Sequence, residues 1–114
     1  MSIGVCVTYH DPSREEYWPY LTQRHLRDCL WPLAAVLGLE RVELLEVLCV
    51  YRSADDLREL LDQLEAVRGY FDDPAAVKDV YPDWQHVQTR TNELSHRLRH
   101  VLAEWPNIAE VSFF

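Results

Sequence analysis

Two histidines near the C-terminal end of the chain have the spacing of metal ligands. His96 and His100 are four residues apart, which places both rings on one face of a helix, as in helical zinc sites. A metalloprotease helix would carry a glutamate beside the first histidine, whereas this segment carries Arg97 and Arg99. Two cationic side chains oppose the binding of a further cation, so we expect a solvated basic face and no metal ion here.

The cysteines and the remaining histidines offer little chemistry at recognisable spacings. Each cysteine lies within an apolar stretch and none belongs to a CxxC pair, so we expect buried, reduced thiols. Cys29 has a histidine, His25, at helical spacing, which is the arrangement that could activate a thiol. His10–Asp11 follows an apolar strand pattern without a nucleophile motif nearby. We therefore expect a protein that is not an enzyme and binds no cofactor. The three cysteines are Cys6, Cys29 and Cys49.

The length and composition predict a single globular domain over residues 1–114. The chain has 114 residues, of which 48% are hydrophobic and 26% are charged. No apolar run approaches the roughly 18 residues that a membrane-spanning helix requires. The opening "MSIGVCVTYH" alternates and carries no basic region, which predicts a strand and not a signal peptide. We expect a cytoplasmic bacterial protein with no membrane partner.

Negative charge is concentrated in the middle of the chain. The net charge is −8, and residues 40–83 contain twelve acidic and five basic side chains. Such a segment repels nucleic acid and anionic lipid and attracts a basic partner over about one Debye length. We expect six of these carboxylates to form an electrostatic contact set. They are Asp55, Asp56, Glu59, Asp62, Asp72 and Asp73.

The first third of the chain predicts a strand followed by a broken helix. β-branched residues alternate with small ones over 2–9, which favours a strand. Ser13 and Glu16 have the spacing of a capping box, and apolar residues follow at helical intervals. Because proline interrupts helices, we expect one helix over about 19–30 and a shorter one over about 32–37, ended by Gly38.

The rest of the chain predicts two long amphipathic helices between two strands. A strand is expected over about 42–51, with a helix up to Glu46 as the alternative, because glutamate and leucine favour helices. Ser53 is then expected to cap a helix with a leucine-rich stripe reaching Phe71. A second helix is expected over about 83–104, and a strand over 108–114. We predict an α+β fold: a sheet of three strands, or of four, with the two long helices and the broken helix packed on it.

An aromatic cluster near the start of the chain is the second candidate contact surface. Three of the four tryptophans precede a proline, and Trp18 lies between Tyr17 and Tyr20. On the predicted helix these rings would point in several directions, so at most half could face the core. Large aromatic side chains beside carboxylates have the composition of an interface hot spot. We expect Tyr17, Trp18 and Tyr20 to form the aromatic anchor of a partner-binding surface.

The central segment resembles a known family. Residues 51–84, "YRSADDLRELLDQLEAVRGYFDDPAAVKDVYPDW", are similar to the family called immunity protein 70 from bacterial polymorphic-toxin and contact-dependent-inhibition systems. The resemblance implies that the chain binds and neutralises a cognate toxin, and the acidic surface suggests a basic, nuclease-like toxin domain. The matching residues are Asp55, Leu57, Leu60, Leu61, Leu64, Phe71, Pro82 and Trp84.

Two other function classes stay open. The chain could be a homodimeric accessory or regulatory domain, in which the exposed rings form a self-complementary interface. It could also be a small metal- or cysteine-dependent enzyme that uses the histidine pair or Cys29. An inhibitor awaiting its toxin is expected to be monomeric until it is bound.

Overall fold

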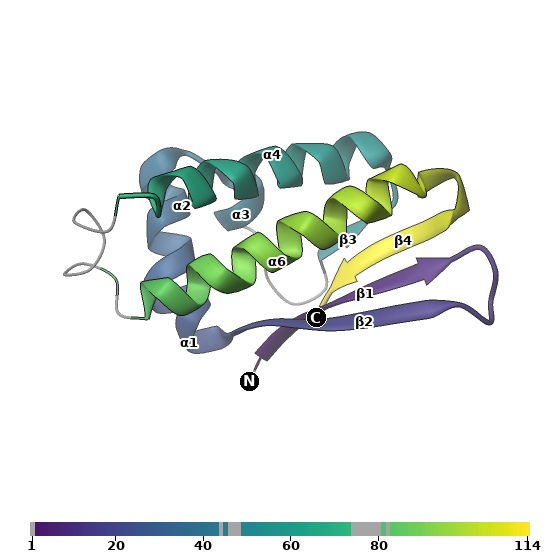
Figure 1. The fold of residues 1–114 in the computed structure, drawn as a ribbon, viewed down its shortest axis with the longest axis horizontal. Coiled ribbons are helices and arrows are strands. Elements are labelled where there is room, and N and C mark those ends of the chain that lie inside the picture. Colours follow the sequence, from purple (N-terminus) through teal and green to yellow (C-terminus); the bar gives the residue numbers. More distant parts are fainter. Residues whose placement is uncertain (1, 44, 46–48, 74–80, 82) are drawn as a thin grey trace.

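A computed structural model describes residues 2–43, 45, 49–73, 81 and 83–114, and it forms a small α+β fold (Figure 1). The strands are β1 (Ser2–Tyr9), β2 (Glu15–Thr22), β3 (Cys49–Tyr51) and β4 (Ile108–Phe113). The helices are α1 (Gln23–His25), the π-helix η1 (Leu26–Leu30), α2 (Trp31–Leu37), α3 (Glu40–Glu43), α4 (Ala54–Tyr70), α6 (Trp84–Ala103) and the 3-10 turn η2 (Trp105–Asn107).

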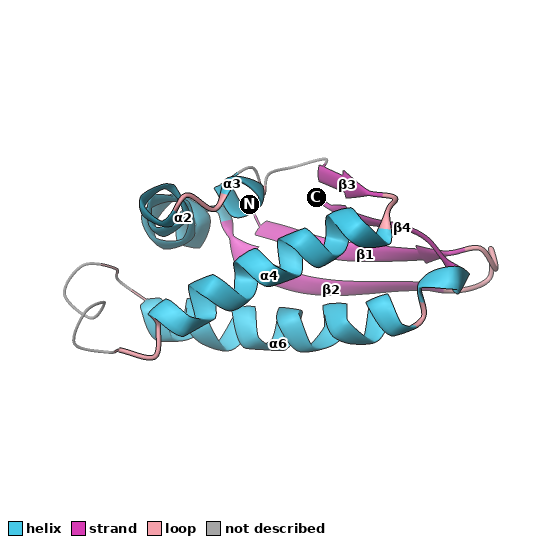
Figure 2. Cartoon of the chain, turned by 90° about the horizontal axis from the view of Figure 1, so that it is seen from above, coloured by secondary structure: helices cyan, strands magenta, loops and turns pink. Residues whose placement is uncertain are grey.

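The four strands form one antiparallel sheet in the order β2-β1-β4-β3. The two termini of the chain therefore contribute the two central strands, and the hairpin strand β2 and the short β3 form the edges. The long helices α4 and α6 lie together on one face of this sheet (Figures 1 and 2). The fold is thus two layers, with α6 packed on β2 and α4 packed on β3.

The two long helices were predicted correctly because their sequence signals are local. Ser53 accepts a hydrogen bond from the backbone N–H of Asp56, which is the expected cap of α4. The leucine stripe of α4 and the apolar stripe of α6 are buried against each other and against the strands. These contacts make the hydrophobic core, whose largest fully buried side chains include Phe71, Phe113, Leu60, Leu64 and Leu98.

The segment between the hairpin and α4 winds through short helices at one end of the sheet. Residues 23–37 are helical without a gap, and Pro32, which has no N–H, lies directly after the π-helical segment η1. Gly38 ends α2 with a φ of 70°, a left-handed conformation that glycine adopts without a steric penalty. The predicted helix end at Gly38 is confirmed, whereas the predicted break near residue 31 is wrong, because η1 joins α1 to α2 without a gap. No helix among the described residues is long and apolar enough to cross a membrane.

The predicted helix over about 19–30 is wrong in its first part, because residues 15–22 form the edge strand β2. Pro19 fits there, since an edge strand tolerates a residue without an N–H. Ser13 does not cap a helix. Instead its N–H and hydroxyl both donate to the Asp11 carboxylate, at 3.0 and 2.8 Å, within the turn between β1 and β2.

The third predicted strand is shorter than expected. In place of a strand over about 42–51, the chain forms α3 over Glu40–Glu43 and then β3 over Cys49–Tyr51. Gln63 of α4 accepts hydrogen bonds from the backbone N–H groups of Arg41 and Val42, which fixes α3 against α4. The rest of the predicted strand includes residues 44 and 46–48, which lie outside the described part of the chain. The sequence also predicts a single turn that starts at Asp73–Pro74 and reaches Val80, and residues 74–80 likewise lie outside the described part of the chain.

Candidate functional site

The face of the sheet opposite the helices is the candidate functional site, and we call it the open face. None of the described elements packs on this face, although it carries large apolar side chains. Tyr17 is 54% exposed, Phe114 is 46% exposed and Val50 is 40% exposed. Contiguous exposed apolar groups on a small domain are typical of an interaction site.

Strand register arranges the open face in three rows that run across the sheet. The first row is polar and contains Glu15, Thr8, Glu110 and the adjoining Arg52. The second row contains Tyr17, Cys6, Ser112 and Val50. The third row contains Pro19, Gly4 and Phe114. Charge therefore lies at one end of the open face, and aromatic and apolar groups lie at the other.

Gly4 gives the aromatic end of the open face its shape. The backbones of Gly4 and Phe114 are joined by two hydrogen bonds, at 2.7 and 3.1 Å. A Cβ atom on residue 4 would come within 2.6–2.8 Å of the Tyr17 ring, so only glycine lets that ring lie on the strand. The Tyr17 and Phe114 ring centroids are 5.6 Å apart. The two rings thus form one pre-arranged aromatic pair.

Charged and polar side chains line the other end of the open face. Cys6 Sγ donates to Glu15 Oε1 at 3.4 Å, and burial together with this carboxylate raises the pKa of the Cys6 thiol. Arg52 Nε donates to Glu110 Oε2 at 3.2 Å. Cys6 is therefore held as a neutral thiol. On its polar side, the aromatic pair is flanked by the carboxylates of Glu15 and Glu110 and the guanidinium of Arg52.

The predicted aromatic anchor does not form one surface, because strand alternation separates its members. Tyr17 lies on the open face, whereas Trp18 points toward α6 and Tyr20 is buried. The Tyr20 hydroxyl is 2.8 Å from the Thr91 hydroxyl, and burial raises its pKa above the usual range. Assigning Tyr20 to a partner contact is therefore wrong in this structure, and the expectation is kept for Tyr17 alone.

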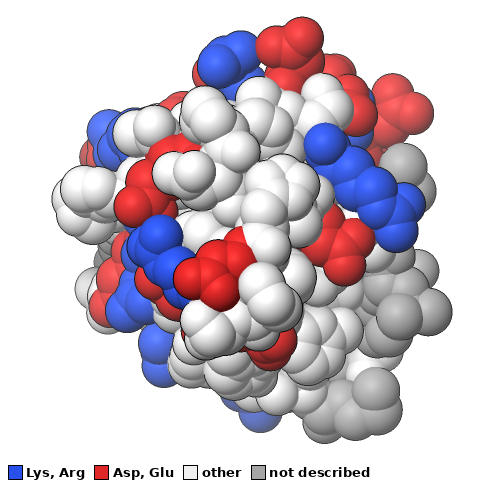
Figure 3. Space-filling view, turned by 90° about the vertical axis from the view of Figure 1, so that its right-hand side faces the viewer, with Lys and Arg blue, Asp and Glu red and all other residues white. Residues whose placement is uncertain are grey.

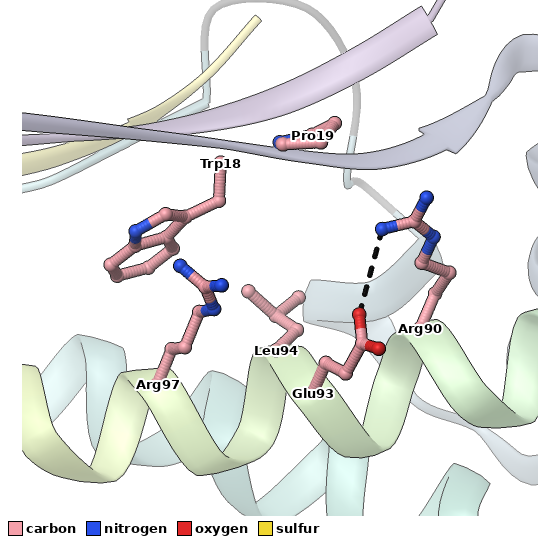
Figure 4. A pocket seen from close by; sticks show the side chains of 6 residues that line it. All are labelled: Trp18, Pro19, Arg90, Glu93, Leu94 and Arg97. Carbon is pink, nitrogen blue, oxygen red and sulfur yellow. Dashed lines mark ion pairs between the residues drawn. The ribbon is translucent and has the colours of Figure 1, made fainter.

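Trp18 lies in a groove between β2 and α6 (Figure 4). The Arg97 guanidinium sits 5.1 Å from the Trp18 ring, which is within cation–π range. Leu94 closes the floor of the groove, and Arg90 and Glu93 form an ion pair at 3.5 Å beside it. The ring is half-buried and already in contact with α6, so it is not an exposed anchor.

The six predicted contact carboxylates are exposed, and Asp55, Asp56 and Glu59 each form an ion pair with an arginine of this chain. Asp55 pairs with Arg58 at 3.0 Å. Asp56 and Glu59 both pair with Arg41 of α3, at 3.0 and 2.9 Å. Figure 3, which views the end of the molecule where α4 begins and α6 ends, shows acidic and basic side chains interspersed. The surface at the start of α4 is therefore of mixed charge.

The other three members of that acidic set are also exposed. Asp62 lies on α4, and Asp72 and Asp73 follow its C-terminal end. All six carboxylates lie on or directly after α4, on the helix layer, so they do not share a surface with Tyr17 on the open face.

A second polar cluster joins the start of α6 to the end of β2. Asp83 accepts from Arg24 at 2.6 Å and lies 3.7 Å from His25 Nε2, while Thr22 Oγ1 is 2.7 Å from His25 Nδ1. The His25 and His86 ring centroids are 4.7 Å apart. Burial first, and His86 next, lower the pKa of His25, so the ring is neutral at pH 7. These contacts hold the start of α6 against α1, which directly follows β2.

The residues considered for catalysis or metal binding are dispersed. His96 and His100 are exposed, with ring centroids 4.8 Å apart, and the described residues contain no group of three ligating side chains that could hold a metal ion. Cys29 is fully buried, and burial raises the pKa of its thiol to about 12. A thiol in that state is a poor nucleophile at neutral pH. His10 and Asp11 lie in the exposed turn between β1 and β2.

Comparisons with known proteins add no family assignment. No protein-family model matches the chain, and no match was found among curated proteins or solved structures.

Sequence reasoning missed most of the open face. Phe114, the aromatic partner of Tyr17, and Val50, on the edge strand, both fall on predicted strands. Neither was predicted to take part in binding. The signal that could have found them is the alternation of 2–9, which places Gly4, Cys6 and Thr8 together on one side of β1. Small and polar residues on one side of a central strand indicate a face that no helix covers.

Proposed function

We propose that the chain is a cytoplasmic, non-catalytic inhibitor of the immunity-protein type, which binds a basic toxin domain through its open face and blocks it sterically. The single observation that carries this proposal is the exposed pair of Tyr17 and Phe114, held on a rigid sheet and flanked by Glu15 and Glu110.

The chemistry of this face suits tight protein recognition. Aromatic side chains contribute large contact areas with little loss of conformational entropy, and interface hot spots are enriched in them. The Tyr17 ring is already placed by Gly4 and Phe114, so little ordering is needed when a partner binds. Val50 and Pro19 extend the apolar area to both edges of the sheet.

The charge of the chain supports a basic partner. Glu15 and Glu110 would meet cationic side chains directly. The overall charge of −8, to which the exposed carboxylates of α4 contribute, would speed the encounter from a distance. In this proposal Asp55, Asp56, Glu59, Asp62, Asp72 and Asp73 assist the approach of the toxin, and the open face makes the contact.

The toxin class rests on the resemblance of residues 51–84 to immunity protein 70 and on the charge of the chain. The proposal predicts that a gene for a large secreted protein with a variable C-terminal domain lies beside the gene for this chain. That C-terminal domain is the probe for the experiment.

The test is protection of bacterial cells that express the C-terminal toxin domain of the neighbouring gene. Tyr17→Arg and Val50→Arg place a cation on the open face, and Val36→Arg is the matched control because Val36 is 75% exposed on α2, outside the open face. We expect the two open-face variants to lose protection by tenfold or more in colony counts, with Val36→Arg unchanged. Equal protection by all three variants, each shown to be folded by circular dichroism, would overturn the proposal.

The alternative of a homodimeric accessory domain is favoured by the same exposed apolar residues, because an uncovered sheet face can pair with a second copy. Light scattering together with the protection assay separates the two functions. A dimer that gives no protection supports the accessory domain.

A further inference from the structure

The three rows of the open face are complementary to themselves. Glu15 lies on the edge strand β2 and Arg52 follows the opposite edge strand β3, and both belong to the same polar row. The four strands have an even order, β2-β1-β4-β3, so the midline of the sheet runs between β1 and β4. A two-fold axis parallel to the strands and above this midline would exchange the two edges.

We infer that the open face is a docking surface for a second copy of this chain, related by that two-fold axis, with Glu15 of each copy opposite Arg52 of the other. The rotation places β2 over β3 of the second copy and β1 over β4, while each row stays opposite the same row. Tyr17 then faces Val50, and Gly4 faces Phe114. Two stacked sheets with strands about 30° apart and about 10 Å between them are a common packing arrangement.

The alternative face-to-face arrangement is less favourable on the same register. A two-fold axis perpendicular to the strands would place each strand over the same strand of the second copy. It would also reverse the order of the rows, so that the first row would face the third. Glu110 would then lie against Phe114 and Glu15 against Pro19, so that carboxylates would lose water to apolar groups. The axis parallel to the strands instead places Glu15 against Arg52 and keeps apolar groups against apolar groups, while Glu110 faces the polar side chain of Thr8.

The size of the face sets the strength of the pairing. Four strands about 4.8 Å apart and three rows about 6.8 Å apart cover roughly 400 Å² per copy. Stable interfaces bury about 800 Å² per partner, so we expect a weak dimer with a Kd of about 100 μM. The free chain is thus expected to be a reversible dimer at high concentration, which departs from the monomer expected from the sequence.

The weak pairing also has a consequence that rests on the proposed function. A toxin that binds the open face would compete with the second copy of the chain. Because the toxin would make the larger contact, it would displace that second copy. Self-pairing would then protect the exposed rings until the toxin arrives. The pairing itself requires no toxin and can be tested with the purified chain alone.

The test is a charge-swap cycle measured by sedimentation from about 10 μM to 1 mM, a range that brackets the expected Kd. Glu15→Arg and Arg52→Glu each create two repulsive contacts in the dimer, so each should weaken it about tenfold. The double variant Glu15→Arg/Arg52→Glu restores opposite charges and should regain most of the lost affinity. The controls Asp62→Arg and Arg58→Glu make the same charge changes on α4 and should leave the dimer unchanged.

Two results would overturn the inference: a monomer throughout this concentration range, or a double variant as weak as the singles. Amide NMR spectra recorded on dilution give an independent reading. We expect shifts confined to the open face, and shifts confined to the α4 surface would contradict the pairing. A monomer that still protects cells would refute only the self-pairing, whereas a dimer that gives no protection would refute only the toxin proposal.

Discussion

The two faces of the sheet are built from the same strands but differ in what stabilises them. On the helix side, Val5, Val7 and Val111 are fully buried beneath α4 and α6. On the open face, Gly4, Cys6 and Ser112 come from the same two strands, and the large side chains beside them remain exposed. The covered face holds the fold together, and the open face is available for recognition. Substitutions on the two faces should therefore have separable effects.

The largest effect is expected on the covered face. Leu98→Ala removes a fully buried side chain of α6 and leaves a cavity in the core, which should lower the free energy of unfolding by about 3 kcal/mol. Urea denaturation followed by circular dichroism measures this change. Leu37→Ala, at an exposed leucine of α2, is the control and should cost less than about 1 kcal/mol. Equal costs for the two variants would contradict the assignment of the core.

A smaller effect is expected where a polar group is buried beneath the helices. Tyr20→Phe removes the hydroxyl that bonds to Thr91 and leaves the Thr91 hydroxyl buried without that partner. The free energy of unfolding should fall by about 1–2 kcal/mol. The double variant with Thr91→Val removes both partners and should recover part of this loss. Failure to recover stability in the double variant would show that the hydrogen bond is not the cause.

A methyl group added at Gly4 should move the Tyr17 ring on the open face but change the stability of the fold only slightly. Gly4→Ala places a Cβ where the Tyr17 ring lies, and this exposed ring can rotate away. We expect a loss below about 1 kcal/mol, because surface rearrangements of this kind cost little. The nuclear Overhauser contacts between Tyr17 and Phe114 should disappear. Their persistence would mean that Gly4 does not position the ring.

The smallest effect is a pH dependence from the cluster at the start of α6. The pKa of His25 in the folded chain is below its ordinary value of 6.5, so the unfolded chain takes up the proton first as the pH falls. The stability that comes from keeping His25 neutral is therefore fully present above about pH 6.5. It is lost progressively as the pH falls from about 6.5 to the lowered pKa of the folded chain. The denaturation midpoint should fall over that window in the native chain and fall less in His25→Gln. His96→Gln, at an exposed histidine, should keep the native profile.

The long helices could be predicted because their signals lie within the segments themselves. The leucine spacing of α4 and the hydrogen bond from Asp56 to Ser53 require no knowledge of distant residues. The strand β2 was not predicted because Ser13 and Glu16 have the spacing of a helix cap. In addition, Pro19 lies inside β2, and proline is unfavourable in most strands as well as in helices. An edge position is a tertiary property, and only the sheet order shows that Pro19 is tolerated there.

The candidate site was harder to predict than the fold because it depends on pairs of residues far apart in the chain. The acidic surface of α4 looked uniform in the sequence, but Arg41 of α3 lies against two of its carboxylates. The aromatic pair joins Tyr17 near one end of the chain to Phe114 at the other. The first arrangement follows from the packing of α3 on α4, and the second from the sheet that brings the two ends of the chain together.

The most direct test of the central claim is hydroxyl-radical footprinting of the chain with and without the toxin domain of the neighbouring gene. We predict that Tyr17 and Phe114 lose reactivity in the complex, while Tyr70 at the end of α4 keeps it. Protection of the α4 side with Tyr17 and Phe114 still reactive would contradict the claim that the open face is the recognition surface.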